Sequence, residues 1–205
     1  MKTLLVIDVQ NDFMPFGALP VARGDEVVAV VNAVTPWFDL VVGTQDWHPA
    51  GHASFASSHP GRSAGEVIDV AGLAQVLWAD HCVQSTPGAS FHSALDIAEI
   101  DHVVRKGTDP NVDSYSAFFD NNRMRDTGLT AYLRAAGARE LWVLGLATDY
   151  CVKFSVLDAL REGFGVALIE DGCRAVDLAS EDGARAVAEM REAGCRVVTS
   201  AEVLG

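Results

Sequence analysis

One stretch of this chain, residues 141–153 (LWVLGLATDYCVK), constrains its fold more than any other. The first half, 141–146, is an unbroken apolar run, typical of a strand that is buried on both faces of a parallel sheet. From Asp149 to about Glu162, apolar residues recur at helical spacing, so the sequence predicts a helix there. Cys151 therefore lies where a strand passes into a helix, near the helix N-terminus.

The position of Cys151 allows two interpretations. A buried cysteine is most often a small hydrophobic side chain. An ordinary thiol, with a pKa of about 8.5, is only slightly ionised at neutral pH. However, a helix N-terminus and a neighbouring cation lower this pKa and create a nucleophilic thiolate. The second interpretation requires a cation, and a base, elsewhere in the chain, and it predicts fast alkylation of Cys151 below pH 7.

Strand and helix patterns alternate along the rest of the chain. Apolar runs predict five further strands, at 3–7, 40–43, 102–105, 166–169 and 196–199. Helical periodicity predicts three further helices, at 24–38, 129–136 and 180–193. We therefore expect an α/β fold with a doubly wound, mostly parallel six-stranded sheet and helices on both faces, in a single domain over residues 1–205.

Two charged residues stand at the ends of predicted strands. Asp8 follows the first strand, and Lys106 follows the strand at 102–105. Alone, each would be read as a solvated acid or a surface lysine. The carboxyl ends of parallel strands share one edge of the sheet, where ligands bind. Asp8, Lys106 and Cys151 can therefore converge there, and a carboxylate base, a cation and a thiol suit nucleophilic acyl transfer.

A candidate metal site follows the second predicted strand, in residues 44–52 (TQDWHPAGH). Asp46 and His48 alternate on an extended backbone, so both side chains can point to one centre. Oxygen and imidazole ligands together suit zinc, iron or manganese. Two ligands do not make a site, and His81 would be a third if the fold brings it close. As a lone histidine, His81 would be structural or exposed.

Composition narrows the classes of partner. The net charge of −13, from 15 basic and 28 acidic residues, disfavours nucleic acid and anionic membranes. No apolar run approaches the roughly 20 residues of a membrane helix, and the apolar N-terminal stretch is too short for a signal peptide. The four cysteines are widely spaced, so we interpret them as reduced thiols. These features suit a soluble cytoplasmic protein.

Five segments, in this order, resemble the nicotinamidase/pyrazinamidase family of the isochorismatase-like cysteine hydrolases. They are LLVIDVQNDFMPFGAL, TQDWHPAGHASFA, WADHCVQSTPGA, RKGTDPNVDSYSAFFDN and GLATDYCV, and they span most of the chain. The resemblance implies hydrolysis of nicotinamide to nicotinate and ammonia, with pyrazinamide as a second substrate. It also implies a cysteine thioester intermediate and a divalent metal that orients the pyridine ring.

The resemblance assigns roles to particular residues. Asp8 would be the base, Lys106 the cation and Cys151 the nucleophile. One divalent metal, zinc in the first place with iron and manganese as alternatives, would be held by three side chains: Asp46, His48 and His81. His52 matches a position that is a fourth ligand in some relatives only.

The resemblance also assigns residues to substrate binding. Phe13 and Trp78 match the aromatic residues that sandwich the pyridine ring. Leu146–Ala147 matches a cis peptide that aims the Ala147 and Cys151 N–H groups as an oxyanion hole.

The chain departs from the family pattern at two loop positions beside His81. Ala79 replaces a proline that is common in relatives, and Ser85 replaces a common glycine. Three alternative functions stay open: another isochorismatase-like amidase acting on a ureido or carbamoyl substrate, an isochorismatase, or a non-catalytic protein that binds a metal or ligand. The sequence also leaves open the identity of the metal, the preference between nicotinamide and pyrazinamide, and a homo-oligomeric state.

Overall fold

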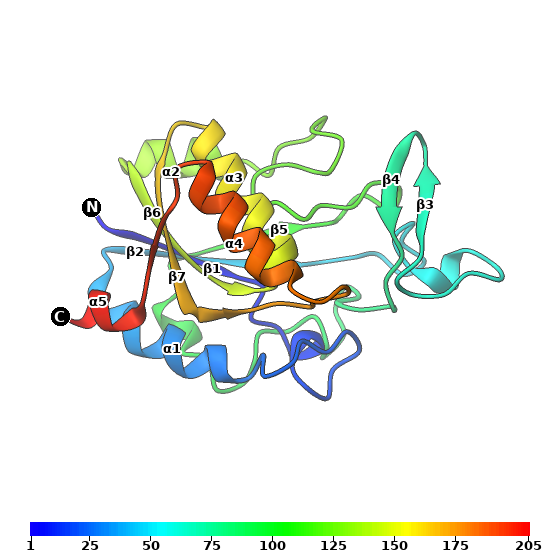
Figure 1. The fold of residues 1–205 in the computed structure, drawn as a ribbon, viewed down its shortest axis with the longest axis horizontal. Coiled ribbons are helices and arrows are strands. Elements are labelled where there is room, and N and C mark those ends of the chain that lie inside the picture. Colours follow the sequence, from blue (N-terminus) through cyan, green and yellow to red (C-terminus); the bar gives the residue numbers. More distant parts are fainter.

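The fold is described by a computed structural model that covers all 205 residues. Six strands form one sheet in the order β5-β2-β1-β6-β7-β8, and every neighbouring pair is parallel (Figure 1). The strands are β1 (Thr3–Ile7), β2 (Leu40–Asp46), β5 (His102–Lys106), β6 (Glu140–Leu146), β7 (Gly165–Arg174) and β8 (Arg196–Val198). The predicted six-stranded parallel sheet is confirmed.

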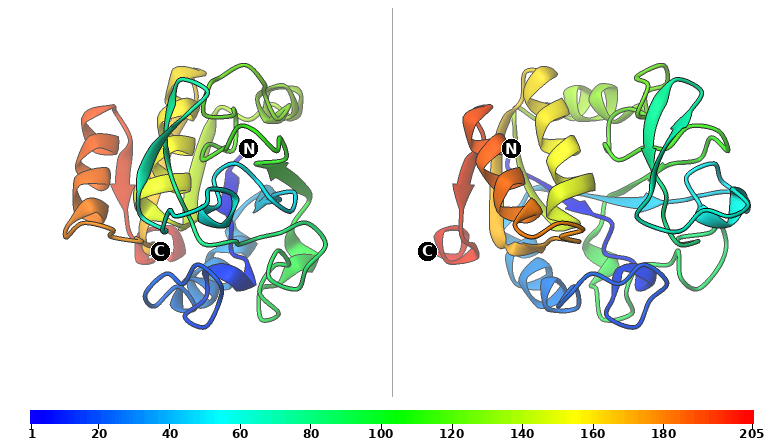
Figure 2. Two further views of the ribbon diagram at one scale, coloured as in Figure 1. Left: turned by 90° about the vertical axis from the view of Figure 1, so that its right-hand side faces the viewer. Right: turned by 45° about the vertical axis from the view of Figure 1, so that its right-hand side comes forward.

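Helices cover both faces of this sheet, as expected for a doubly wound fold. They are α1 (Glu26–Val34), α2 (Leu129–Ala136), α3 (Lys153–Arg161), α4 (Asp182–Glu192) and α5 (Ser200–Leu204). Helices α1 and α5 lie together on one face, whereas α2, α3 and α4 lie on the other (Figures 1 and 2). The predicted helix at 24–38 is shorter than expected, because a 3₁₀ turn with a proline replaces its last part.

A small antiparallel hairpin, β3 (Val67–Val70) and β4 (Leu73–Val76), stands apart from the main sheet (Figure 2). Its turn uses Ala71 and Gly72, both with positive φ. The sequence analysis predicted neither this hairpin nor α5. The hairpin is short and half-exposed, so it lacks the long buried run that identified the other strands. It leads directly into Trp78.

The sheet changes direction between β1 and β6. Connections from β1 run outward to β2, and those from β6 run the other way to β7, so the crevice at their carboxyl ends is a topological switch point. The two strands approach closely because Gly145, with φ of 127°, pairs with Ile7; a Cβ at this glycine would lie 2.1 Å from the Ile7 carbonyl oxygen. Asp8 and Cys151 both follow these two strands.

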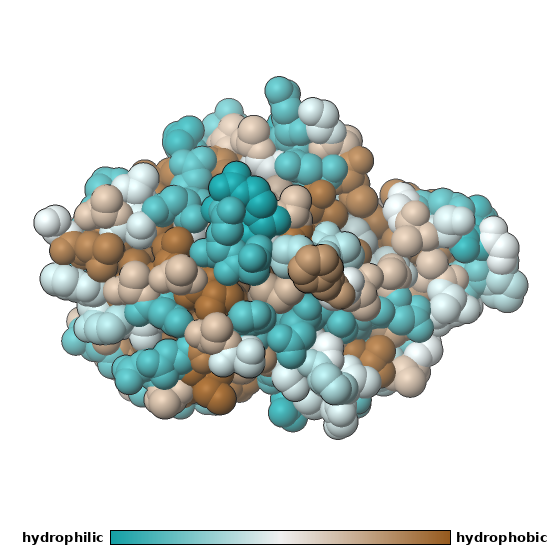
Figure 3. Space-filling view, turned by 90° about the horizontal axis from the view of Figure 1, so that it is seen from below, coloured by the Kyte–Doolittle hydropathy of each residue, from teal (hydrophilic) through white to brown (hydrophobic).

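No helix is both long and apolar enough to cross a bilayer. On the face that carries α1, apolar residues occur in small groups between polar ones (Figure 3).

Candidate active site

The structure brings Asp8, Lys106 and Cys151 together at the switch point. Lys106 is the last residue of β5 and is completely enclosed. Its Nζ lies 2.9 Å from Asp8 Oδ2 and 3.2 Å from Cys151 Sγ. The same ammonium group donates to the Ser114 carbonyl at 3.0 Å and forms an ion pair with Asp46 Oδ1. Lys106 therefore links Asp8, Asp46 and Cys151, although these residues come from distant parts of the chain.

Asp8 is held by the neighbouring strand. Its backbone adopts φ of 47°, a left-handed conformation that aspartate tolerates better than most residues. Thr44 of β2 supports the carboxyl group, because its hydroxyl donates to Asp8 Oδ1 at 2.6 Å and accepts the Asp8 N–H at 3.1 Å. Only Lys106 approaches the second oxygen, Oδ2, so this oxygen keeps a lone pair for a proton.

The pKa values of the site follow from burial and from its crowded charges. Burial raises the pKa of the Asp8 carboxyl group, against the pull of Lys106, and this makes Asp8 a better base. Burial opposes ionisation of Lys106, but Asp46 and Asp8 raise its pKa well above the ordinary value. Burial also opposes ionisation of Asp46, but Lys106 and His48 hold its pKa well below the usual range.

One expectation about Cys151 is wrong in direction. The sequence predicted a lowered thiol pKa, but burial raises the pKa of Cys151 well above its ordinary value. Lys106 acts in the expected direction, yet the carboxylates of Asp8 and Asp46 act against it. The sequence analysis had counted only the cation and the helix end. In the structure, the thiol is enclosed and has two carboxylates as neighbours.

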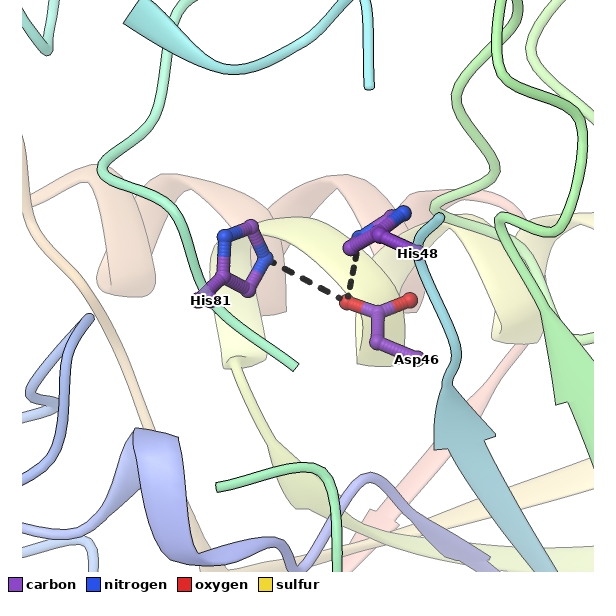
Figure 4. Close-up of side chains that lie close together, drawn as sticks. All are labelled: Asp46, His48 and His81. Carbon is purple, nitrogen blue, oxygen red and sulfur yellow. Dashed lines mark ion pairs between the residues drawn. The ribbon is translucent and has the colours of Figure 1, made fainter. Parts of the chain in front are cut away.

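Asp46, His48 and His81 form a second group beside the first (Figure 4). Asp46 Oδ2 lies 3.6 Å from His48 Nε2 and 3.7 Å from His81 Nε2, so both imidazoles face one carboxylate oxygen. All three side chains are buried. The group matches the three metal ligands that the resemblance implied.

The rings of both histidines are oriented by backbone carbonyl groups. His48 Nδ1 donates to the Gly107 carbonyl at 3.0 Å, and His81 Nδ1 donates to the Ala79 carbonyl at 2.8 Å. Each ring therefore turns the lone pair of Nε2 toward Asp46, as histidine ligands of metals commonly do. Gly107 lies against the His48 ring, since a Cβ there would come within 2.4 Å of it.

These residues fit a divalent cation. His48 Nε2 is buried and has no hydrogen-bond partner in the protein, which is costly unless something else binds it. One carboxylate oxygen and two imidazole nitrogens are a donor set that zinc accepts. Gln10 fixes the backbone of Asp46 from both sides, by accepting the Asp46 N–H at 2.9 Å and donating to its carbonyl at 2.8 Å.

His52 lies behind this group. Its ring packs 4.5 Å from the ring of His48, and it forms a separate cluster with His48 and Asp113. The backbone N–H of Ser54 donates to His52 Nδ1 at 3.1 Å, and His52 Nε2 is buried without a hydrogen-bond partner in the protein. The role of His52 as a fourth ligand stays a prediction.

A pocket opens above Cys151 and reaches Asp46 and His81. The four substrate-binding residues that the sequence suggested, Phe13, Trp78, Ala147 and Cys151, all line it. The sequence analysis missed five further lining residues: Leu19, Asp113, Tyr115, Tyr150 and Val176. The aromatic content of residues 109–122 was a signal for Tyr115, although it did not indicate which face of the segment meets the pocket.

The segment before Cys151 has an irregular backbone. The Leu146–Ala147 peptide is cis, as the resemblance implied. A π-helical turn, Thr148–Val152, then leads into α3 and contains Cys151, two residues before α3 begins. The Tyr150 and Val152 N–H groups both donate to the Ala147 carbonyl, at 3.1 Å each. These bonds fold the chain around Cys151 Sγ.

The two departures from the family pattern leave this geometry intact. Ala79 still supplies the carbonyl group that orients His81. Ser85 adopts φ of 64°, the left-handed region that favours glycine, so serine occupies a glycine conformation here.

Comparisons with known proteins agree with the geometry. The sequence model of the Isochorismatase domain matches residues 2–202. A nicotinamidase of Escherichia coli (strain K12) is 50% identical over 181 residues, which are 86% of this chain and 84% of the relative.

Two solved structures share the fold over nearly the full length. A nicotinamidase/pyrazinamidase of Acinetobacter baumanii superposes with a TM-score of 0.96 at 41% identity, covering 99% of this chain and 98% of that one. A pyrazinamidase of Pyrococcus horikoshii in complex with zinc gives a TM-score of 0.79 at 37% identity, covering 97% and 98%. The chain therefore belongs to the isochorismatase family and, within it, to the nicotinamidase/pyrazinamidase group.

Proposed function

We propose that the protein is a nicotinamidase, which hydrolyses nicotinamide to nicotinate and ammonia and also accepts pyrazinamide. The observation that carries the proposal is the position of Lys106 Nζ, within 3.2 Å of both Asp8 Oδ2 and Cys151 Sγ, where Cys151 lines a pocket with aromatic walls. A base, a cation and a thiol at one point suit attack on a carboxamide.

The first half of the reaction forms a thioester. Asp8 accepts the Cys151 Sγ proton, which its raised pKa favours, and Lys106 stabilises the thiolate as it forms. Sγ attacks the carboxamide carbon, and the N–H groups of Ala147 and Cys151 stabilise the oxyanion. Removing one such donor typically raises a barrier by about 3 kcal/mol. Asp8 returns the proton to the leaving nitrogen, so that the C–N bond breaks and ammonia departs.

The second half regenerates the enzyme. Asp8 removes a proton from a water molecule, which attacks the thioester carbon and breaks the C–S bond. Sγ leaves as a thiolate beside Lys106 and recovers its proton from Asp8. The products are nicotinate and the free thiol.

Asp46, His48 and His81 would hold a divalent metal, for which we propose zinc. When bound, the ion supplies a Lewis acid that anchors and orients the pyridine nitrogen, directly or through a water molecule. Phe13 and Trp78 would sandwich the ring. Asp8 and Lys106, and not the metal, would activate the Cys151 thiol.

Ammonia release from nicotinamide by the purified protein, before and after chelation, tests the proposal. We expect fast release that falls after chelation and returns with added zinc. A competing function, hydrolysis of a ureido or carbamoyl compound by a sister amidase, would give no release from nicotinamide by protein that holds zinc and has a reactive Cys151. That result would overturn the proposal.

A further inference from the structure

The carboxylate of Asp12 holds a backbone segment that connects the two histidines of the metal group. Asp12 Oδ2 accepts the Cys82 N–H at 2.7 Å. Cys82 directly follows His81, and its carbonyl group accepts the His48 N–H at 3.0 Å. One carboxylate therefore supports, through the backbone of Cys82, the chain at both residues that carry an imidazole.

The backbone of Cys82 is in a conformation that requires support. Its φ is 45°, in the left-handed region that residues with a Cβ rarely adopt, and such a conformation persists only where its surroundings hold it. Asp12 holds the N–H group and His48 holds the carbonyl group. His48 lies two residues beyond the end of β2, and His81 lies on the loop that follows β4 (Figure 4). The hydrogen bonds of Cys82 therefore join two segments that belong to no common sheet.

Close packing against Gly88 places the Asp12 carboxylate. A Cβ at Gly88 would lie 2.1 Å from Asp12 Oδ2 and 2.3 Å from Oδ1, so a larger residue would displace the carboxylate. The Asp12 N–H donates to the Gly88 carbonyl at 3.0 Å, and Asp12 Oδ1 accepts the Ala18 N–H at 3.3 Å. Backbone and side chain of Asp12 are thus both fixed on the side away from Cys82.

Asp12 acts on the site only through other residues. It is not one of the three residues that would bind the metal, and it does not line the pocket. Its neighbour Phe13 does line the pocket, and the Phe13 ring packs 5.5 Å from the ring of His81. The residue is therefore placed to orient the site without contact with the substrate.

We propose that Asp12 is a positioning residue for metal binding, which sets the place of His81 relative to His48 through the Cys82 backbone. The inference rests on the proposed metal site of Asp46, His48 and His81. Groups that orient metal ligands commonly control the affinity of the site, although they do not touch the ion. Gly88 contributes by leaving the space that the carboxylate occupies.

Zinc affinity of the metal-free protein, measured by competition with a chromophoric chelator, tests the inference independently of activity. In Asp12→Ala we expect the dissociation constant for zinc to rise about 10- to 100-fold, because the Cys82 N–H loses its acceptor. Asp12→Asn keeps an oxygen for this N–H, so its dissociation constant should rise only about threefold or less. An unchanged value in Asp12→Ala would overturn the inference. An equal rise in Asp12→Asn would also overturn it, because charge and not the hydrogen bond would then be responsible.

Gly88→Ala displaces the same carboxylate without changing its chemistry. We expect the dissociation constant for zinc to rise about tenfold in this variant. In the Asp12→Ala background the same substitution should have no further effect, because its methyl group then enters the space that the carboxylate left. Equal effects of Gly88→Ala in both backgrounds would contradict the inference.

Asp101→Ala is the matched control for the lost hydrogen bond. Asp101 Oδ2 also accepts a backbone N–H from a distant segment, that of Val41 at 2.8 Å, but near the start of β2, whereas Asp46 is at its end. Zinc affinity should stay within about twofold of the wild-type value. A loss as large as that in Asp12→Ala would overturn the inference, since it would reflect a general effect on the fold. Wild-type protein that binds no zinc would overturn the proposed metal site, and the inference with it.

Discussion

The two halves of the site are built in different ways. The charged half lies on the sheet: Asp46 and Lys106 end β2 and β5 and are direct register partners, and Asp8 follows β1. The aromatic half lies on connections, with Phe13 on a 3₁₀ turn and Trp78 after the hairpin. Strand register fixes Asp46 and Lys106, whereas loops shape the space around the ring. Chemistry and selectivity therefore depend on separate parts of the chain.

Replacing the nucleophile should have the largest effect. We expect Cys151→Ala to lower kcat by at least about 10⁴-fold, because no other group can form the thioester. Zinc content should stay at the wild-type level, since Cys151 is outside the group of Asp46, His48 and His81. Steady-state kinetics and metal analysis of the same sample check both points. Substantial residual amidase activity would contradict the mechanism.

Replacing Lys106 should lower the stability of the folded protein. Lys106→Met leaves the buried carboxylates of Asp8 and Asp46 without a counter-charge, so we expect a loss of about 3–5 kcal/mol in the free energy of unfolding. Urea denaturation measures this loss. Lys153→Met is a matched control, because Lys153 pairs only with the exposed Glu189 and should cost less than about 1 kcal/mol.

Crowding His48 should weaken metal binding. In Gly107→Ala the new methyl group would collide with the imidazole ring and turn Nε2 away from Asp46. We expect zinc affinity to fall about 10- to 100-fold, as for other losses of ligand orientation. A competition assay with a chromophoric chelator measures this. Gly163→Ala is the control, because it has a similar positive φ of 85° but open space around it, and its zinc affinity should be unchanged.

The pH dependence of alkylation tests whether the Cys151 thiol is ionised at neutral pH. Since the folded protein raises the pKa of Cys151, the thiol is mostly protonated at neutral pH, and the thiolate fraction grows as the pH rises. The rate of modification by iodoacetamide should therefore increase about tenfold per pH unit between 7 and 9. A rate that is already high and flat below pH 7 would show a preformed thiolate, as the sequence alone had suggested.

Substitutions in the aromatic half should have smaller effects on the kinetics. Trp78→Phe keeps an aromatic wall but loses area and the N–H group that donates to Tyr115. We expect KM for nicotinamide to rise a few fold, about 1 kcal/mol in binding, with a smaller change in kcat. A fall in kcat as large as its rise in KM would break the division between the two halves.

The same division explains how much could be predicted from sequence. Asp8, Lys106 and Cys151 follow predicted strands, so the rule that parallel strands end on one edge was enough to bring them together. The raised pKa of Cys151 was not predicted, because it depends first on how deeply the thiol is buried and then on the two carboxylates beside it. Tyr115 was also missed, since the loop after β5 has no periodic pattern that fixes which side chains face inward.

Asp46 turns its two carboxylate oxygens to different neighbours, Oδ1 to Lys106 and Oδ2 to the two histidines. One side chain is thus shared between the cation of the acid–base centre and the proposed metal ligands. If protonation of Lys106 changes the metal affinity by some factor, metal binding must change the protonation constant of Lys106 by the same factor. Metal occupancy and the protonation of the lysine beside Cys151 are thermodynamically linked through the carboxylate of Asp46.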